Sequence, residues 1–256
     1  MSLIQKLKDS GFAFKKSLGQ NFIVDEGYLH SIVKELNLSK DDVVIEVGTG
    51  AGTLTRVLSQ YVKQVITYEV DKRLEPILAQ QFAGIKNIEL RFEDALQANI
   101  KQEKFALVAN IPYYITTPLI VKFINHPNCT SIAVLVQKEL AHRIVAKPGS
   151  KDYGALSVGI QTRASARIIK EVSRRTFVPA PNVDSALVLI EKSGTSELGK
   201  DFDTFLKNVF SQRRKKLSNS VPNIQPQFKD LRPEQLTVQQ FVEVWQNLFD
   251  KKNNKT

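Results

Sequence analysis

The chain has 256 residues, of which 42% are hydrophobic and 24% charged, and it carries a formal net charge of +10. This length and composition suit one large domain with a small appendage, or two modest domains, and no apolar run is long enough to span a membrane. The single cysteine, Cys129, excludes an internal disulfide and a cysteine-based metal cluster, and it suits a reducing cytoplasm. The positive charge favours a nucleic-acid partner, although solubility alone would account for it.

Helical and strand-like patterns alternate over the first 190 residues. Apolar residues at helical spacing predict a helix over 25–37. Strands are expected at 43–47, 64–69, 87–92, 105–110 and 131–137, and helices between them at 52–61, 71–82 and 117–124. In the last of these helices Thr117 is placed to cap the start and Pro118 to occupy the first turn.

This alternation is typical of βαβ units, so we predict a doubly wound α/β fold with a mostly parallel sheet and helices on both faces. Two later strands, 168–172 and 185–191, could close the sheet as an antiparallel edge. Beyond a linker-like stretch at 193–196 the pattern is helical only, over 202–213 and 238–249. We therefore predict two domains, residues 1–193 and a small, basic, all-α domain over 194–256.

A glycine-rich turn follows the first of these strands. Gly48, Gly50 and Gly52 form a G-x-G-x-G turn that opens a helix. Glycine lets the backbone approach a ligand closely, and a helix start offers free N–H groups. A dinucleotide fingerprint would have glycine where Thr53 stands, so pyrophosphate binding is disfavoured. With the acidic Glu46 before it, the turn fits a ligand without phosphates such as S-adenosylmethionine, although the turn alone fits another nucleotide as well.

Two further strand ends carry acidic residues at the edge where such sheets bind ligands. Glu69 ends the second strand, and a carboxylate there can accept hydrogen bonds from both hydroxyls of a ribose. Asp94 follows the third strand and could accept a hydrogen bond from an adenine amino group. For both residues a solvated charge at a strand end is the alternative.

The fourth strand runs into Asn110-Ile111-Pro112-Tyr113. The carboxamide oxygen of Asn110 and the carbonyl of Ile111 can each accept one N–H bond from an exocyclic amine and so aim its lone pair. Pro112 helps to point that carbonyl into a pocket, and Tyr113 offers a face on which a flipped-out base can stack. Methyl transfer needs no strong base, because the amine becomes acidic as it reacts. An ordinary strand-to-turn Asn-Pro is the alternative.

At these residues the chain resembles a known family. The segments 16–22, 48–52, 110–113 and 177–181 resemble, in order, the signature of the ribosomal RNA adenine dimethyltransferases, and the resemblance covers nearly the whole chain. The segments 148–154 and 210–217 are similar to the KsgA-type branch, which acts on the small ribosomal subunit, rather than to the branch that methylates large-subunit RNA and confers macrolide resistance. Ile111 departs from the KsgA-type pattern, because that branch tends to carry leucine at this position.

The resemblance implies a Rossmann-like class I S-adenosylmethionine-dependent methyltransferase sheet, with 1–193 as the catalytic domain and 194–256 as an RNA-binding domain. The residues implied to contact S-adenosylmethionine are Gln20, Asn21, Ile23, Gly48, Gly50, Glu69, Asp94 and Asn110. Those implied in catalysis are Asn110, Pro112, Tyr113 and Phe177. Phe177 would stack on the face of the target base opposite Tyr113, and a core aromatic is the alternative. Those implied to grip the RNA backbone are Arg213, Arg214, Lys215 and Lys216, for which a solvated helix face is the alternative.

The implied substrate is a pair of adjacent adenosines in a hairpin near the 3′ end of small-subunit (16S) rRNA, each methylated twice at N6. The implied partner is the immature small ribosomal subunit. We expect a cytoplasmic monomer with no metal and no membrane attachment. The alternatives are a large-subunit (23S) rRNA enzyme and a non-catalytic RNA-binding relative. A DNA adenine enzyme matches less well, because it usually carries aspartate where Asn110 stands.

Overall fold

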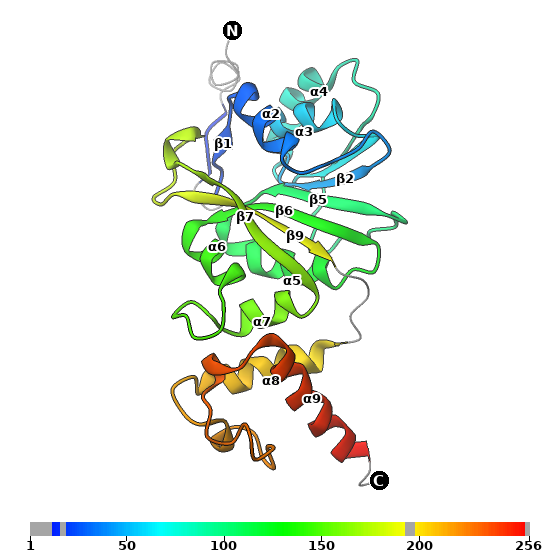
Figure 1. Cartoon of the computed structure of the whole chain (residues 1–256). Helices are drawn as coiled ribbons and strands as arrows, with labels where there is room; N and C mark the ends of the chain where they lie inside the picture. Colours follow the sequence, from blue (N-terminus) through cyan, green and yellow to red (C-terminus); the bar gives the residue numbers. More distant parts are fainter. Residues whose placement is uncertain (1–11, 16–18, 193–197, 254–256) are drawn as a thin grey trace. The chain divides into compact units, whose positions relative to one another are not determined.

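The computed structural model describes residues 12–15, 19–192 and 198–253. They belong to two compact units (Figure 1). The first comprises Met1–Ala141 and Arg167–Glu191, and the second comprises His142–Ala166 and Lys192–Thr256. Part of the segment 16–22 and the expected linker at 193–196 lie outside the described residues.

A seven-stranded sheet forms the centre of the first unit, in the order β4-β3-β2-β5-β6-β9-β7. Its strands are β2 (Val43–Val47), β3 (Gln64–Tyr68), β4 (Ile88–Arg91), β5 (Phe105–Asn110), β6 (Cys129–Gln137), β7 (Ala164–Val172) and β9 (Ser185–Lys192). Strands β4, β3, β2, β5 and β6 are parallel, and β9 is antiparallel to β6. The predicted parallel sheet and its antiparallel closing strand are therefore confirmed, with β7 at the edge beside β9.

Helices cover both faces of this sheet. They are α2 (Glu26–Lys34), α3 (Thr53–Ser59), α4 (Glu75–Phe82) and α5 (Thr116–Ile124), with short 3₁₀ turns η2 (Lys72–Leu74), η3 (Tyr113–Ile115) and η4 (Arg174–Thr176). Helix α6 (Lys138–Val145) directly follows β6 and spans the boundary between the two units. Figure 1 shows α2, α3 and α4 on one face and α5 on the other. Asp25 caps α2, because its side chain accepts a hydrogen bond from the N–H of Tyr28.

The predicted cap at Thr117 is wrong. The turn η3 runs directly into α5, so the helix begins one residue earlier, at Thr116, and its N-cap residue Ile115 makes no side-chain cap bond. Pro118 does lie in the first turn of α5, where its missing N–H costs no helical hydrogen bond.

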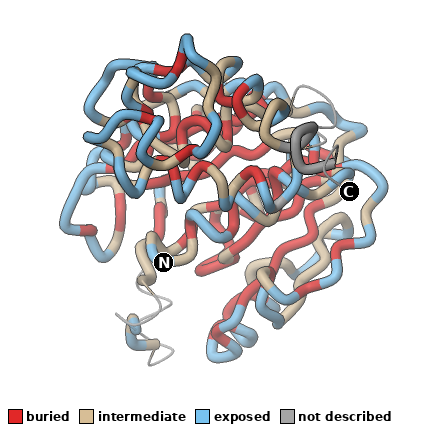
Figure 2. Tube along the Cα trace, turned by 90° about the horizontal axis from the view of Figure 1, so that it is seen from below, coloured by how far each residue is buried: buried red, intermediate tan, exposed pale blue. Residues whose placement is uncertain are grey.

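The main core of the first unit lies between the sheet and helices α2 and α3. Leu29, Ile32 and Val33 of α2 pack there with Val57 and Leu58 of α3 and with apolar residues of the strands. The central strands are buried on both faces, which explains their continuous apolar sequences (Figure 2). This rigid core fixes the loops that leave the carboxyl ends of the strands.

The second unit is helical. It contains α7 (Ala155–Gln161), α8 (Lys200–Ser211) and α9 (Val238–Asn253), with 3₁₀ turns η5 (Leu217–Asn219) and η6 (Pro233–Gln235). The prediction placed 142–166 in the first domain, whereas the structure groups these residues with the C-terminal helices. The reason is burial, because Tyr153 and Val158 lie in one apolar cluster with Phe202 and Phe241. No helix among the described residues is long and apolar enough to cross a membrane.

Candidate functional site

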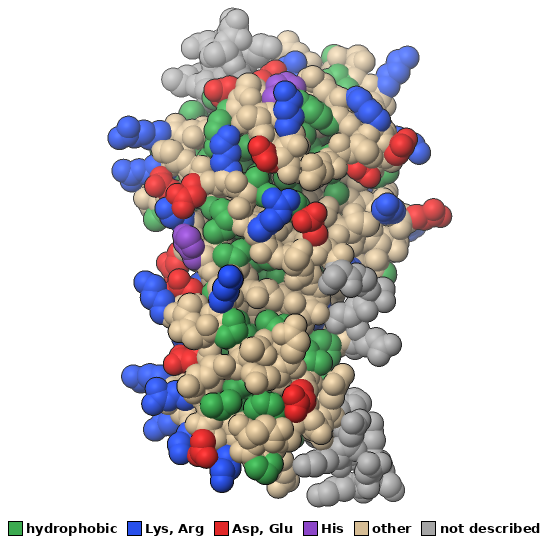
Figure 3. All heavy atoms as spheres, viewed as in Figure 1, with side chains coloured by type: hydrophobic (Ala, Val, Ile, Leu, Met, Phe, Trp, Pro, Cys, Tyr) green, Lys and Arg blue, Asp and Glu red, His purple; other side chains and the backbone are tan. Residues whose placement is uncertain are grey.

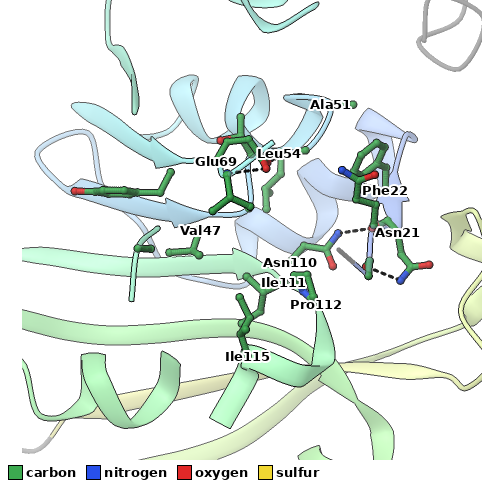
Figure 4. Close-up of a pocket in the computed structure, with 18 of the residues that line it drawn as sticks. Asn21, Phe22, Val47, Ala51, Leu54, Glu69, Asn110, Ile111, Pro112 and Ile115 are labelled. Atoms are coloured by element: carbon green, nitrogen blue, oxygen red, sulfur yellow. Dashed lines mark hydrogen bonds between the residues drawn. The ribbon is translucent and has the colours of Figure 1, made fainter. Parts of the chain in front are cut away.

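A cavity of about 230 Å³ lies at the carboxyl ends of β2, β3, β4 and β5 (Figure 4). Its wall is formed by the loops that follow these strands and by the N-terminal segment 19–23. The lining includes every residue predicted to contact a cofactor, namely Gln20, Asn21, Ile23, Gly48, Gly50, Glu69, Asp94 and Asn110. The structure thus brings together residues that are far apart in the sequence, because the ends of parallel strands meet at one edge of the sheet.

The glycine turn after β2 forms one side of the cavity. Gly48, Gly50 and Gly52 all have positive φ, at 82°, 54° and 81°. At Gly50 a Cβ atom would lie 2.8 Å from Cε1 of Phe22, closer than real side chains approach. Both the conformation and the space therefore require glycine at this position.

Glu69 connects that turn to the end of β3. Its Oε2 accepts a hydrogen bond of 2.8 Å from the N–H of Gly50, and its Oε1 accepts bonds from the N–H groups of Val70 and Asp71 at 2.9 and 2.8 Å. Burial raises the pKa of the Glu69 carboxyl, and the three N–H groups act in the opposite direction. A carboxylate oxygen can accept two hydrogen bonds, so Oε2 retains capacity for a ligand hydroxyl.

Asn110 stands at the end of β5, facing the N-terminal segment. Its Nδ2 donates a hydrogen bond of 3.1 Å to the backbone carbonyl of Asn21 (Figure 4). A carbonyl only accepts, so the amide nitrogen must face Asn21 and Oδ1 must face away from it. The amide is therefore held in one orientation, with its oxygen left to accept a hydrogen bond from a ligand.

Two further sets of contacts hold the N-terminal segment to the rest of the first unit. Strand β1 (Phe22–Ile23) pairs antiparallel with β8 (Phe177–Val178). Gln20 donates from Nε2 to Oδ2 of Asp71 at 2.9 Å, while its Oε1 accepts from the N–H of Lys15. The guanidinium of Arg73 bonds the same carboxylate and holds the pKa of Asp71 below its usual range. The side chain of Gln20 is thus engaged by the protein itself.

Tyr113 and Phe177, predicted to stack on the target base, both have contacts within the protein. Pro112 lines the cavity, but Tyr113 and Phe177 do not. The hydroxyl of Tyr113 is 2.9 Å from Oγ of the buried Ser185, and Phe177 is only 4% exposed, within the core. This arrangement fits the core-aromatic alternative for Phe177. Tyr114, 64% exposed, lines the cavity instead, and no local pattern in the sequence separates it from its neighbour.

The basic cluster of the second unit divides into two pairs. Arg213 is ion-paired with Glu234 at 2.7 Å and donates to the carbonyls of Lys151 and Ser150, while Lys216 is paired with Asp230 at 2.8 Å. Arg214, Lys215 and Lys216 are exposed, and the Lys216–Asp230 pair lies at the surface. Figure 3 shows Lys and Arg side chains gathered along one side of this unit. Arg213 and Lys216 thus have structural partners within the unit.

The acidic residue before the glycine turn is fully buried. Oε2 of Glu46 accepts a hydrogen bond of 2.6 Å from Thr55, and Oε1 has no hydrogen-bond partner within the described part of the chain. Burial raises the pKa of Glu46 to about 8. The carboxyl is therefore protonated at neutral pH. Across the described ranges, no group of three or more His, Cys, Asp or Glu side chains could hold a metal ion.

Comparisons with known proteins agree on one family. A family model described as ribosomal RNA adenine dimethylase matches residues 11–248. The chain is 42% identical over 243 residues to a Thermotoga neapolitana protein named ribosomal RNA small subunit methyltransferase A, covering 93% of each. It is similar to the structure of a dimethyladenosine transferase from Plasmodium falciparum (TM-score 0.78, 26% identity, 90% of this chain and 97% of that one). It is also similar to the structure of the 23S rRNA methyltransferase ErmE (TM-score 0.70, 27% identity, covering 87% of this chain and 98% of that one).

Replacing Glu46 by Gln should change how stability depends on pH. The native carboxyl has a pKa of about 8 against an ordinary value of 4.5, so the native state holds a proton that the unfolded chain releases within this window. Stability from this group is fully present below pH 4.5 and is lost as the pH rises toward 8, by up to about 1.4 kcal/mol per pH unit. Urea unfolding of both proteins between pH 5 and 8 measures this. If the unfolding free energies of the wild type and Glu46→Gln depend on pH in the same way, the carboxyl of Glu46 is ionised in the native state and the prediction is wrong.

Proposed function

The chain belongs to the ribosomal RNA adenine dimethylase family, and we propose that it dimethylates the N6 amino groups of two adjacent adenosines in a hairpin near the 3′ end of small-subunit (16S) rRNA. Its sheet is the Rossmann-like sheet of class I S-adenosylmethionine-dependent methyltransferases. The observation that carries the proposal is the fixed Asn110 amide at the cavity wall. An acceptor held there suits an amine as the group that reacts.

The cavity fits S-adenosylmethionine better than a phosphorylated nucleotide. Its described lining contains the acidic residues Glu69, Glu93 and Asp94 and no lysine or arginine. Such a wall repels phosphate and attracts a cationic sulfonium. The Gly48–Gly50 backbone gives close access. Glu69 would accept from one ribose hydroxyl through the free position on Oε2, rather than from both hydroxyls as the sequence suggested, and Asp94 would accept from the adenine amino group. Gln20, Asn21 and Ile23 would lie at the methionine end.

The chemistry then depends on orientation. When bound, the sulfonium supplies an activated methyl group. Oδ1 of Asn110 and the carbonyl of Ile111 would each accept one N–H of the adenosine amino group, which draws the nitrogen toward a tetrahedral shape and aims its lone pair. Pro112, fixed in φ, sets the direction of that carbonyl. Positioning of this kind lowers the barrier without a strong general base.

The small subunit is the favoured substrate. The relatives at about 40% identity are named for the small subunit, whereas ErmE, a 23S enzyme, is 27% identical to this chain. The partner would be the immature small ribosomal subunit, and S-adenosylmethionine the methyl donor. Arg214 and Lys215, exposed in the second unit, would contact the RNA backbone, because Arg213 and Lys216 are already paired with acidic residues.

The function is tested by transfer of tritiated methyl groups to ribosomal subunits from an unmethylated host. We expect counts in small-subunit particles only, and we expect Asn110→Ala to reduce the rate by roughly 10²–10³-fold because the amine loses an acceptor. Asn125→Ala is the matched control, since its amide also donates to a backbone carbonyl, that of Val121, but away from the cavity. Counts confined to large subunits, or near-normal turnover by Asn110→Ala, would refute the proposal.

The role of the basic cluster is tested by the salt dependence of RNA binding. The double variant Arg214→Ala, Lys215→Ala should reduce the slope of log affinity against log salt concentration by up to about 0.9 for each phosphate that is no longer neutralised, with an unchanged melting temperature. Arg213→Gln should instead lower the melting temperature and keep the slope, because it breaks the bonds to Glu234, Ser150 and Lys151. A reduced slope for Arg213→Gln, with an unchanged slope for the double variant, would instead assign RNA binding to Arg213.

A further inference from the structure

Lys122 on α5 makes an unusual set of contacts beside the cavity. Its Nζ donates to the backbone carbonyls of Ala95, Leu96 and Ala98 at 2.8, 3.0 and 2.7 Å. An ammonium group has three protons, so all of them are directed at one loop. Lys122 is half-buried, and burial lowers its pKa while the nearby Asp94 and Glu93 act in the opposite direction.

This loop is the wall that follows β4. Asp94, Ala95 and Leu96 line the cavity, and the loop makes a single tight turn in which the N–H groups of Gln97 and Ala98 donate to the carbonyl of Asp94. Oδ1 of Asp94 accepts from the N–H of Leu96. These local bonds leave the carbonyls of Ala95, Leu96 and Ala98 directed toward one point, where the ammonium of Lys122 satisfies them.

Lys122 also connects two parts of the site. It belongs to α5, which follows Asn110 and Pro112 through the turn η3, whereas the loop it bonds carries Asp94. A neutral side chain of the same length could fill the space but could not satisfy three converging carbonyls. Without the ammonium those carbonyls would turn toward solvent, and the side chain of Asp94 would lose its fixed position.

We propose that Lys122 is a positioning residue that holds Asp94 against the cavity and thereby sets the preference of the site for adenine over a purine without an amino group. The inference rests on the proposed function, in which Asp94 accepts a hydrogen bond from the adenine amino group of the cofactor. Lys122 itself touches neither the cofactor nor the reacting atoms in this account.

The test is a calorimetric titration of the full chain with two ligands. One is S-adenosylhomocysteine, and the other is the same compound with purine in place of adenine, which lacks the amino group. Wild-type protein should prefer the adenine compound by roughly tenfold or more, the effect of one missing hydrogen bond to a charged acceptor. Lys122→Met should bind the adenine compound more weakly and lose most of this preference.

Lys170→Met is the matched control. Lys170 is also a partly buried lysine of the first unit, but its ammonium bonds Ser31 at 3.2 Å and lies over the ring of Tyr28, and neither residue lines the cavity. It should keep the wild-type preference. If Lys122→Met does not fold, Lys122→Arg replaces it, since a planar guanidinium cannot meet all three carbonyls in the same geometry, and a reduced preference is again expected.

The outcomes separate the two levels of the proposal. A folded Lys122 variant that binds more weakly but keeps the wild-type ratio would make Lys122 merely structural and overturn this inference, while leaving the proposed function intact. If the wild-type protein binds the adenine and purine compounds equally well, Asp94 does not contact the adenine amino group, and this inference is wrong. Wild-type protein that binds neither compound would overturn the proposed function itself.

Discussion

The carboxylate of Glu69 is the point on which the geometry of the cavity depends. By accepting the N–H of Gly50 it fixes the glycine turn of β2 to the end of β3, and its bonds to Val70 and Asp71 fix the loop beyond. Because Gly50 has no side chain, the ring of Phe22 packs directly on the turn and brings the N-terminal segment to the cavity. The carbonyl of Asn21 in that segment then orients the Asn110 amide. The cofactor wall and the amine-binding group are therefore parts of one connected arrangement.

Much of the fold was predictable because the physical signals are local. Strands β2 and β5 are buried on both faces, so their apolar runs predicted 43–47 and 105–110 as the structure has them. The candidate cofactor residues were predictable for a topological reason. In a parallel sheet the strand ends meet at one edge, so polar residues such as Glu69, Asp94 and Asn110 had to converge there. The bond between Asn21 and Asn110 places the N-terminal segment at this site as well. The resemblance implied that position, whereas the residues alone did not indicate it.

What could not be predicted depends on contacts between distant parts of the chain. Residues 142–166 contain α7, which the sequence did not reveal, and they belong to the second unit because Tyr153 and Val158 bury against α8 and α9. A run of four basic residues has the same sequence whether it meets RNA, solvent or acidic side chains, so the pairing of Arg213 with Glu234 was invisible. Phe177 precedes a proline-rich turn under either interpretation, and its burial follows only from its packing in the core of the folded chain. Lys122 likewise carried no local signal, since its partners lie on a distant loop of the chain.

The central claim is that the Glu69 carboxylate organises a cavity for a nucleoside that carries a sulfonium. Calorimetric titration of S-adenosylhomocysteine into wild-type protein and Glu69→Gln tests it directly, because the amide keeps the size of the side chain but has one acceptor oxygen instead of two. The account predicts clear binding by the wild type and an affinity at least about tenfold lower for the variant, which loses an acceptor for both the glycine turn and the ribose. Equal affinities, or no heat from the wild-type protein, would contradict it.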